Sequence, residues 1–368
     1  MGKIMDWLKT AKQRLKSGYA LDRRFYFDTN VFELETAYLE KHWVALARVS
    51  DFETAYSYKT YNILNHKVII ALDKANQFYS YSAICPHRGA VIADGVGVGK
   101  HHRCPYHAWK FSIDGSLIGA PFMEKKDCQG LHRYGCLVWQ GWIFVNLSGD
   151  ADIEMFNTDS VNAELQDYRL SELVPLADKI TFEGAFNWKS VIDNFGESYH
   201  VIGTHKDSIY DSIDFKRSHW RATEQFNASN YPSFDAERTF FPQPRFNLKN
   251  TAANTCNFQL YPMLLIGLTP DFVIWIELEI VERLYTRAHY HILGLPEIIA
   301  DEAMSVRLPQ LRSSIEHIAG EDIGAYLNVG SSAMSKPYPS GRLSQFEQGT
   351  QSWFQWYLNN MLKGAVDV

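Results

Sequence analysis

Two short cysteine–histidine loops place the strongest constraint on how this chain can fold. The first loop carries Cys85 and His87, which are separated by one residue, and the second carries Cys104 and His107, which are separated by two. Sixteen residues lie between His87 and Cys104, and a proline follows each cysteine and stiffens its turn. Two such loops can close over one metal centre.

The donor atoms narrow which centre these loops can hold. Thiolate suits zinc or iron–sulfur clusters, and imidazole suits zinc, copper or iron. A structural zinc site usually groups its cysteines together and its histidines together, whereas each half here mixes one of each. In a Rieske centre two thiolates hold one iron and two imidazoles hold the other. The spacing therefore favours a Rieske centre over zinc and over four unrelated core residues.

The sequences CPHRG (85–89) and CPYHAWKF (104–111) resemble the Rieske signature of ring-hydroxylating and related oxygenases. The resemblance implies a 2Fe–2S cluster held by the two cysteines and two histidines named above. That signature usually has glycine where this chain has Ala108, and we expect only a local backbone adjustment. His101 and His102 adjoin the second loop outside the motif, and we expect both to be exposed loop residues.

A second group of ligand-type residues follows a gap of domain size. Two histidines and one carboxylate typically hold a non-haem iron that activates O₂. His200 and His205 are five residues apart, so on a regular helix they would point about 140° apart. They converge only if the helix ends or bulges between them, which Gly203 permits. Alone, the pattern also fits an amphipathic helix with two ordinary surface histidines, with Glu197 sharing the face of His200.

After the first motif, this second pattern extends the resemblance to the whole α subunit of a Rieske oxygenase, from about residue 20 onward. The resemblance implies a third ligand, an aspartate near the start of a late helix, which is Asp322, with Glu321 as its close rival. It also implies that Glu197 bridges His200 to a cluster histidine of a neighbouring subunit. Glutamate in DNFGESYH is most similar to the glycine-betaine and carnitine monooxygenase branch.

The apolar patterning predicts an α+β protein. Short strand-like runs broken by Gly, Asn and Asp predict an all-β Rieske 2Fe–2S domain over 42–148. Later strand candidates and helices predict a catalytic domain over 149–368, with an antiparallel sheet flanked by helices in a helix-grip arrangement. The N-terminal helices of 1–41 are expected to pack on the catalytic domain. The later helices are expected at 188–202, 301–319, 321–335 and 350–364.

Composition excludes several other classes of protein. The chain has 368 residues, a formal net charge of −6 and no basic run, so we expect no nucleic-acid partner. No stretch approaches the ~20 apolar residues of a membrane span. Five scattered cysteines do not form a disulfide framework, and the N-terminus is no secretory signal, so we expect a cytoplasmic protein.

The motifs and the resemblance predict a terminal oxygenase with a Rieske 2Fe–2S cluster and a mononuclear Fe(II). It would use O₂ and electrons from a separate NAD(P)H-dependent reductase or ferredoxin, because no nicotinamide or flavin fingerprint is present. The expected reaction is monooxygenation and N-demethylation of a small quaternary ammonium compound, with aromatic-ring dioxygenation as the alternative. A Rieske electron carrier or a zinc-binding module are the alternatives outside this class. The resemblance implies a homotrimer.

Overall fold

The computed structural model describes residues 2–149, 159–234, 239–241, 246, 254–300, 302–333, 335 and 339–364. The chain divides into two compact units, which are described separately. The larger unit comprises Met1–Tyr38 and Ile153–Val368, and the smaller unit comprises Leu39–Asp152. None of the described helices combines the length and the apolar character that crossing a lipid bilayer requires.

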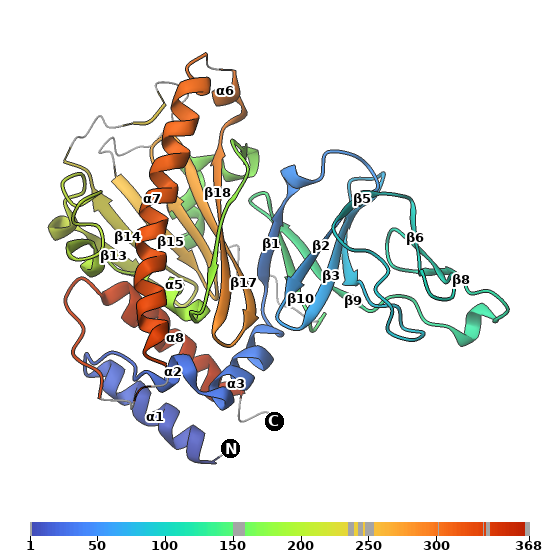
Figure 1. Ribbon diagram of the computed structural model, residues 1–368, viewed down its shortest axis with the longest axis horizontal. Coiled ribbons are helices and arrows are strands. Elements are labelled where there is room, and N and C mark those ends of the chain that lie inside the picture. The colour runs from blue at the N-terminus through green and yellow to red at the C-terminus, as the bar shows by residue number, and fades with distance from the viewer. Residues whose placement is uncertain are drawn as a thin grey trace. The chain divides into compact units, whose positions relative to one another are not determined.

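The smaller unit is built from antiparallel strands (Figure 1). A seven-stranded sheet has the order β1-β10-β9-β4-β3-β2-β5, and a separate three-stranded sheet has the order β6-β7-β8. Gln140 and Gly141 both have positive φ, which suits the two-residue turn that joins β9 to β10. The strands are β1 Val44–Arg48, β2 Ser57–Ile63, β3 His66–Leu72, β4 Phe78–Ser82, β5 Val96–Val98, β6 His101–Arg103, β7 Lys110–Ser112, β8 Leu117–Gly119, β9 Arg133–Trp139 and β10 Trp142–Asn146.

The larger unit is organised around an eight-stranded antiparallel sheet. Its order is β11-β18-β17-β16-β15-β14-β13, and β12 pairs with β18 beside β11. This sheet and its flanking helices confirm the predicted α+β class. The strands are β11 Val174–Pro175, β12 Ile180–Gly184, β13 His219–Ala222, β14 Phe226–Pro232, β15 Asn254–Leu260, β16 Leu264–Leu268, β17 Val273–Glu282 and β18 Tyr285–Gly294.

Helices cover the sheet of the larger unit. The long helix α7 runs along the sheet, while α1 contacts α8, and α8 also contacts α5 and β14 (Figure 1). Buried Trp188 of α5 packs edge-on against Trp353 of α8, which fixes α5 on the helical layer. The helices are α1 Gly2–Lys16, α2 Arg24–Phe27, α3 Thr29–Leu39, α4 Asp159–Leu165, α5 Trp188–Phe195, α6 Pro296–Ile299, α7 Met304–Ser331 and α8 Gln348–Gly364.

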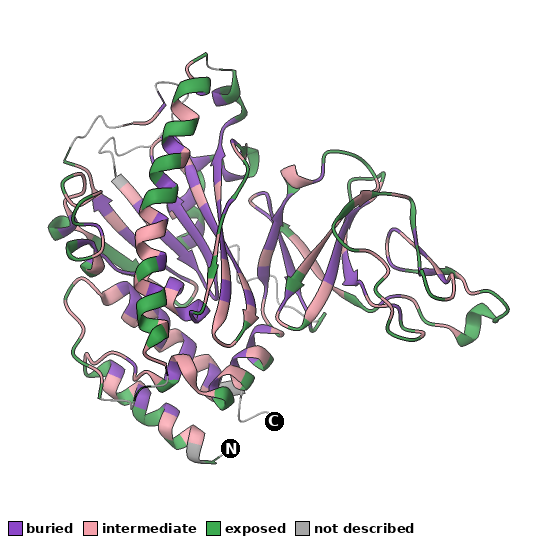
Figure 2. Ribbon diagram, viewed as in Figure 1, coloured by how far each residue is buried: buried purple, intermediate pink, exposed green. Residues whose placement is uncertain are grey.

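The prediction of two separate helices over 301–319 and 321–335 is wrong, because α7 is continuous through Gly320. A helical glycine costs about 1 kcal/mol relative to alanine. Leu311, Ile315, Ala319 and Ile323 recur every four residues and are all buried. Burying each larger apolar side chain is worth about 1.5–3 kcal/mol, so this stripe outweighs the glycine. Figure 2 shows the opposite side of α7 exposed along its length.

Candidate metal centres

The first cysteine–histidine loop is a tight backbone turn. The Cys85 amide donates to the Ala90 carbonyl at 2.8 Å, and the Gly89 amide donates to the Cys85 carbonyl at 3.0 Å. Gly89 has φ +75°, a left-handed conformation that glycine adopts without steric cost. This turn holds Cys85 in the core while it carries His87 toward the surface.

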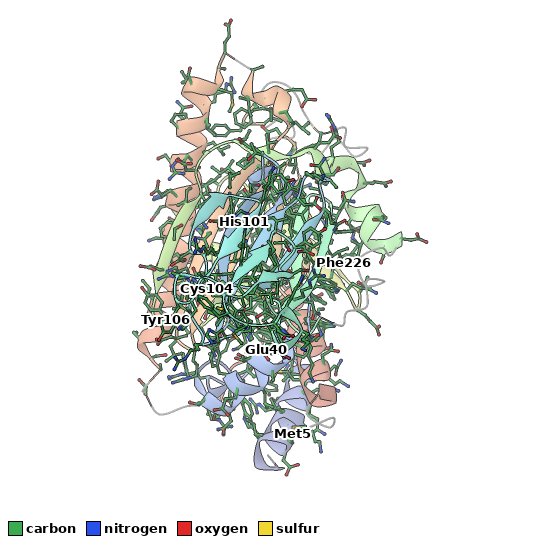
Figure 3. The ribbon with its side chains drawn as sticks, turned by 90° about the vertical axis from the view of Figure 1, so that its right-hand side faces the viewer. Met5, Glu40, His101, Cys104, Tyr106 and Phe226 are labelled. Atoms are coloured by element: carbon green, nitrogen blue, oxygen red, sulfur yellow. The ribbon has the colours of Figure 1, made fainter. Side chains whose placement is uncertain are left out.

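The second loop repeats the same backbone frame. The Cys104 amide donates to the Trp109 carbonyl at 2.8 Å, and the Ala108 amide donates to the Cys104 carbonyl at 3.1 Å. Ala108 occupies the place of Gly89 and has φ +60°, so it is an alanine in a conformation that favours glycine. The backbone keeps the frame without glycine. Figure 3 labels Cys104 and Tyr106 on this loop.

The side chains of the two loops form a set of four potential ligands. Cys85 and Cys104 are 1% and 3% exposed, and the rings of His87 and His107 are 4.6 Å apart. The Nδ1 atoms of both histidines are buried, and neither has a hydrogen-bond partner among the described residues. Burial raises the pKa of the Cys85 thiol, and the adjacent Cys104 thiol adds to this effect. Unpartnered imidazole nitrogens beside two close thiols fit a 2Fe–2S cluster.

Two aromatic rings flank these imidazoles. Trp109 stacks on His87 with ring centroids 4.9 Å apart and an interplanar angle of 8°. Tyr106 lies over His107 at 3.8 Å and is 59% exposed. The two imidazoles are therefore held in place by ring packing. Tyr106 itself faces solvent in the isolated chain.

The prediction that both His101 and His102 are exposed loop residues is wrong for His102. Both lie in β6, whose side chains alternate, so His101 is exposed and His102 is buried. The His102 Nε2 atom lies 2.9 Å from the Tyr81 hydroxyl. Burial lowers the pKa of His102 to about 4. His102 is thus a structural residue of the smaller unit.

The second candidate centre begins where α5 ends. The Asn187 side chain accepts from the Lys189 amide and caps the start of this helix. At the other end, a Cβ atom at Gly349 would lie 2.2 Å from the Gly196 carbonyl oxygen. Only glycine at 349 therefore lets the start of α8 approach this point. The chain leaves the helix here and turns toward His200.

Glu197 fixes the orientation of His200. Its Oε1 atom lies 2.6 Å from His200 Nδ1, and its Oε2 atom accepts from the His200 amide at 3.1 Å and from the Tyr199 amide. His200 lies in a 3₁₀ turn, Tyr199–Ile202, and Gly203 caps that turn. The predicted break in helical geometry is therefore present, but it occurs before His200 and not only at Gly203. Nε2 of His200 faces Asp322.

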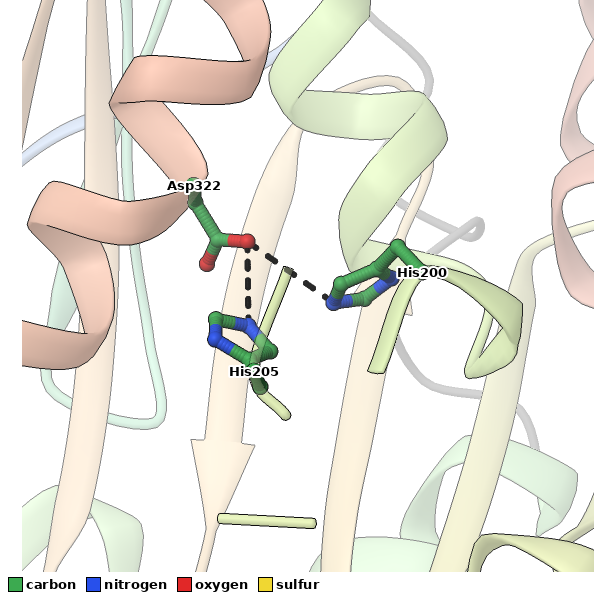
Figure 4. A group of neighbouring side chains, drawn as sticks. All are labelled: His200, His205 and Asp322. Atoms are coloured by element: carbon green, nitrogen blue, oxygen red, sulfur yellow. Dashed lines mark ion pairs between the residues drawn. The ribbon is translucent and has the colours of Figure 1, made fainter. Parts of the chain in front are cut away.

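His200, His205 and Asp322 converge on one point (Figure 4). Asp322 Oδ1 lies 3.1 Å from His205 Nε2 and 3.7 Å from His200 Nε2. One potential ligand atom from each residue lies within 4.8 Å of the others. Two imidazole nitrogens and one carboxylate oxygen form the donor set that suits a non-haem iron.

Glu321 lies on the outer side of this group. Its Oε2 atom is 2.8 Å from His205 Nδ1 and accepts from the Ser208 hydroxyl at 2.6 Å. Both histidines thus have a carboxylate on Nδ1, which is the usual way to orient a metal-binding imidazole. Without a metal, two effects act on the pKa of His200. Burial lowers this pKa, but the negative charges of Glu197 and Asp322 raise it by more, so the net pKa is raised.

The expectation that Asp322 lies near the start of a helix is wrong. Asp322 lies well inside α7, because the two helices expected on either side of Gly320 are continuous. The sequence did not reveal Asn194, which contacts Asp322, or Tyr326, which contacts Asn194. Asn194 Nδ2 donates to Asp322 Oδ1 at 3.3 Å, and the Tyr326 hydroxyl donates to Asn194 Oδ1 at 2.9 Å. The one available signal was that Tyr326 follows Asp322 by one helical turn.

A cavity of about 190 Å³ opens beside His200, His205 and Asp322. Its walls come from α5, α7, the strands β14 to β18 and the segment that follows His205. Glu197 also lines it. The three converging residues therefore face a space in which a small molecule can reach them.

The two units match two family models. The model described as the ring hydroxylating alpha subunit (catalytic domain) covers residues 171–363. The model described as the Rieske [2Fe-2S] domain covers residues 42–135. The first of these spans more than half of the chain.

Two curated relatives are oxygenase subunits of monooxygenases. The carnitine monooxygenase oxygenase subunit of Escherichia coli (strain K12) is 26% identical over 69% of this chain and 69% of that protein. The glycine betaine monooxygenase oxygenase subunit of Pseudomonas aeruginosa PAO1 is 26% identical over 63% of this chain and 56% of that protein.

Solved structures share the fold. The quaternary ammonium Rieske monooxygenase CntA, in complex with an inhibitor, superposes with a TM-score of 0.80 at 20% identity over 93% of this chain and 95% of that chain. Naphthalene 1,2-dioxygenase from Rhodococcus sp. gives a TM-score of 0.78 at 18% identity over 98% and 99%. The chain belongs to the ring-hydroxylating α-subunit family of Rieske oxygenases, enzymes that hold a 2Fe–2S cluster and a mononuclear iron.

Proposed function

We propose that this chain is a terminal oxygenase in which His200, His205 and Asp322 hold the mononuclear iron. The supporting observation is the convergence of their ligand atoms beside a cavity of about 190 Å³. The engagement of Glu321 Oε2 by His205 Nδ1 and the Ser208 hydroxyl supports Asp322 over Glu321 as the third ligand. When bound, the cluster supplies single electrons and the iron supplies O₂ activation.

The proposed cluster ligands are Cys85, His87, Cys104 and His107. Their support is the repeated loop frame and the two buried, unpartnered Nδ1 atoms. A zinc site is the alternative for the same four residues. Zinc would leave the purified protein colourless and without acid-labile sulfide, whereas a Rieske cluster would colour it brown-red.

Glu197 is the proposed link between the two centres of neighbouring subunits. Its carboxylate already holds His200 through Nδ1 at 2.6 Å. A histidine from the smaller unit of a second copy, His87 or His107, would complete the bridge. This role requires an oligomer, and we propose a homotrimer.

The proposed reaction is monooxygenation of a small organic substrate. The names of the carnitine and glycine betaine relatives favour an N-methylated ammonium compound. Hydroxylation of an N-methyl carbon gives a carbinolamine that separates into the amine and formaldehyde. Ring dioxygenation is the less favoured alternative, supported by the family description and by a fold shared with naphthalene 1,2-dioxygenase.

The remaining proposals concern partners and location. A separate NAD(P)H-dependent reductase or ferredoxin would deliver the electrons, and the protein would work in the cytoplasm. The residues that line the cavity would position the substrate and exclude water. Glu197 and Glu321 would hold the imidazoles of His200 and His205 in their orientation.

Metal analysis and oxygen consumption test the proposal together. The purified protein should contain two cluster irons, two acid-labile sulfides and one further iron per chain. With a surrogate reductase and NADH, O₂ uptake should depend on an added substrate and give one hydroxylated or demethylated product per O₂. Zinc in place of iron, or iron without substrate-dependent O₂ uptake, would contradict the proposed function.

A further inference from the structure

The size of the cavity limits what can enter it. An apolar cavity of about 150 Å³ holds a benzene molecule. The cavity beside His200 and His205 has a volume of about 190 Å³. It therefore accommodates a molecule of about one ring with a small substituent, or an alkyl chain of equal bulk.

Aliphatic side chains make most of the wall beyond the metal-binding group. They come from the segment after His205, from β17 and from α7. Among the described lining residues there is no lysine and no arginine, and the charged groups are the carboxylates of Glu197 and Asp322 and the two histidines. The aliphatic wall is formed by Ile209, Ile213, Ile274, Ile276, Ile315 and Ile318.

Most polar atoms of the lining already have partners in the protein. Asn257 donates to the Phe195 carbonyl at 3.1 Å, and the Tyr231 hydroxyl donates to the Glu197 carbonyl at 3.2 Å. Asn194 contacts Asp322 and Tyr326. Beyond the metal-binding group and Glu197, the described lining residues therefore offer a mostly hydrocarbon surface, with uncharged hydroxyl groups in a few places.

We propose that this pocket takes a substrate with a hydrocarbon body and no carboxylate. The inference rests on the proposed oxygenase function, because the bond to be oxidised must face the group of His200, His205 and Asp322. The rest of the molecule then lies against the isoleucines. A carboxylate packed against these described isoleucines would lose its hydration and gain no cation from them, which is strongly unfavourable.

This property separates the chain from the compounds in the names of its relatives. Carnitine and glycine betaine both carry a carboxylate, which needs a positively charged or strongly donating partner in a binding site. An N-methylated ammonium compound without a carboxylate keeps the proposed chemistry and fits the described wall. The lining thus identifies the substrate class within the proposed function.

Matched pairs of compounds test the inference on the ferrous holoenzyme under anaerobic conditions. One pair is butyltrimethylammonium and γ-butyrobetaine, and the other is toluene and 4-methylbenzoate; each pair differs by a carboxylate. Calorimetry should show that the compound without a carboxylate binds at least about 100-fold more tightly than its partner in each pair, a difference of about 2.8 kcal/mol in binding free energy. Equal or tighter binding of the carboxylates would overturn the inference.

A variant provides a second, independent readout. Ile318 precedes Asp322 by one helical turn and lines the pocket, so Ile318→Arg places a guanidinium at the wall. This variant should narrow or reverse the preference within each pair. Ile299→Arg is the matched control, because Ile299 is 55% exposed on α6, and its preference should equal that of the unmodified protein. An unchanged preference in a folded, iron-loaded Ile318→Arg protein would contradict the proposed wall.

The two proposals fail in different ways. If the compounds without a carboxylate bind as expected but none supports O₂ uptake with a reductase, the oxygenase function fails and the pocket chemistry stands. If a carboxylated compound binds tightly and is oxidised, the function stands and the inferred substrate class is wrong.

Discussion

Ala108 and Gly89 occupy the same place in two loops that share one backbone frame, yet only one is glycine. Alanine in the left-handed region costs about 1–2 kcal/mol, partly offset by the greater chain entropy that glycine loses on folding. Ala108→Gly should therefore raise the free energy of unfolding by up to about 1 kcal/mol. The measurement is denaturant unfolding followed through the cluster absorbance.

Gly89→Ala is the matched reverse change. A Cβ atom at Gly89 meets no atom within 4 Å, so the expected loss of about 1 kcal/mol would come from backbone strain alone. If Ala108→Gly lowered stability or Gly89→Ala raised it, the assignment of the shared frame would be wrong.

Under the proposed function, substitutions at Glu197 and His200 should separate the effects on electron transfer from those on metal binding. Glu197→Gln keeps the size and removes the charge, so the cluster spectrum and the iron content should be retained while turnover is nearly lost. His200→Ala should lose the mononuclear iron and keep the cluster. Turnover near that of the unmodified protein in Glu197→Gln, or full iron content in His200→Ala, would remove these roles.

At the scale of elements, α3 and α5 are joined by an ion pair removed from solvent. Lys189 Nζ lies 2.6 Å from Glu35 Oε1, and both side chains are 1% exposed. Burial lowers the pKa of Lys189 and raises that of Glu35, and the attraction between the two groups opposes both shifts. Lys189→Met should cost about 3–5 kcal/mol, because it leaves a buried carboxylate without a counter-charge.

Two variants calibrate that cost in urea unfolding. Replacing both partners, with Glu35→Leu and Lys189→Met, should restore most of the lost stability. Arg169→Met breaks exposed pairs with Glu172 and Glu297, whose side chains are 50% and 53% exposed, and it should cost about 1 kcal/mol or less. Equal losses from the buried and the exposed pair would contradict the role of Lys189.

Asp193, also on α5, predicts a dependence of stability on pH. Burial raises its pKa from 3.8 to about 7, while Tyr26 donates to its carboxylate at 2.7 Å. The folded state then keeps a proton that the unfolded state releases, so this contribution to stability is lost as pH rises from about 4 to 7. Asp193→Asn should therefore gain stability relative to the unmodified protein between pH 5 and 8. The exposed Asp6→Asn control should show no such trend in thermal unfolding.

The sequence predicted which residues converge at the candidate sites better than it predicted the elements that carry them. The spacing around Cys85 and Cys104 reports a local loop, because the contacts that shape it lie within six residues. Asn194 and Tyr326 were missed because their contacts join α5 to α7, which are far apart in the chain. The predicted helix break at Gly320 is wrong because burial of the apolar stripe on α7 outweighs the free-energy cost of a glycine within a helix. His102 was misassigned because a three-residue strand has almost no periodic signal.

At the scale of the whole molecule, the electron route can be tested by mixing two inactive proteins. Cys104→Ala should lack the cluster, and His200→Ala should lack the mononuclear iron. If electrons pass between subunits, mixed oligomers should recover part of the turnover, because some neighbours then combine an intact cluster with an intact iron site. Recovery should require subunit exchange, checked by co-purification of two differently tagged variants. No recovery in verified mixed oligomers would place the route within one chain.

The unbroken course of α7 has a mechanical consequence. A helix of 28 residues is about 42 Å long, and Asp322 lies about two and a half turns from its C-terminal end. The backbone of Asp322 is part of this helix, so a tilt of α7 moves the carboxylate with it. Substitutions that loosen the packing at either end of α7 should therefore change the position of Asp322 at the proposed metal site, even though they lie far from it.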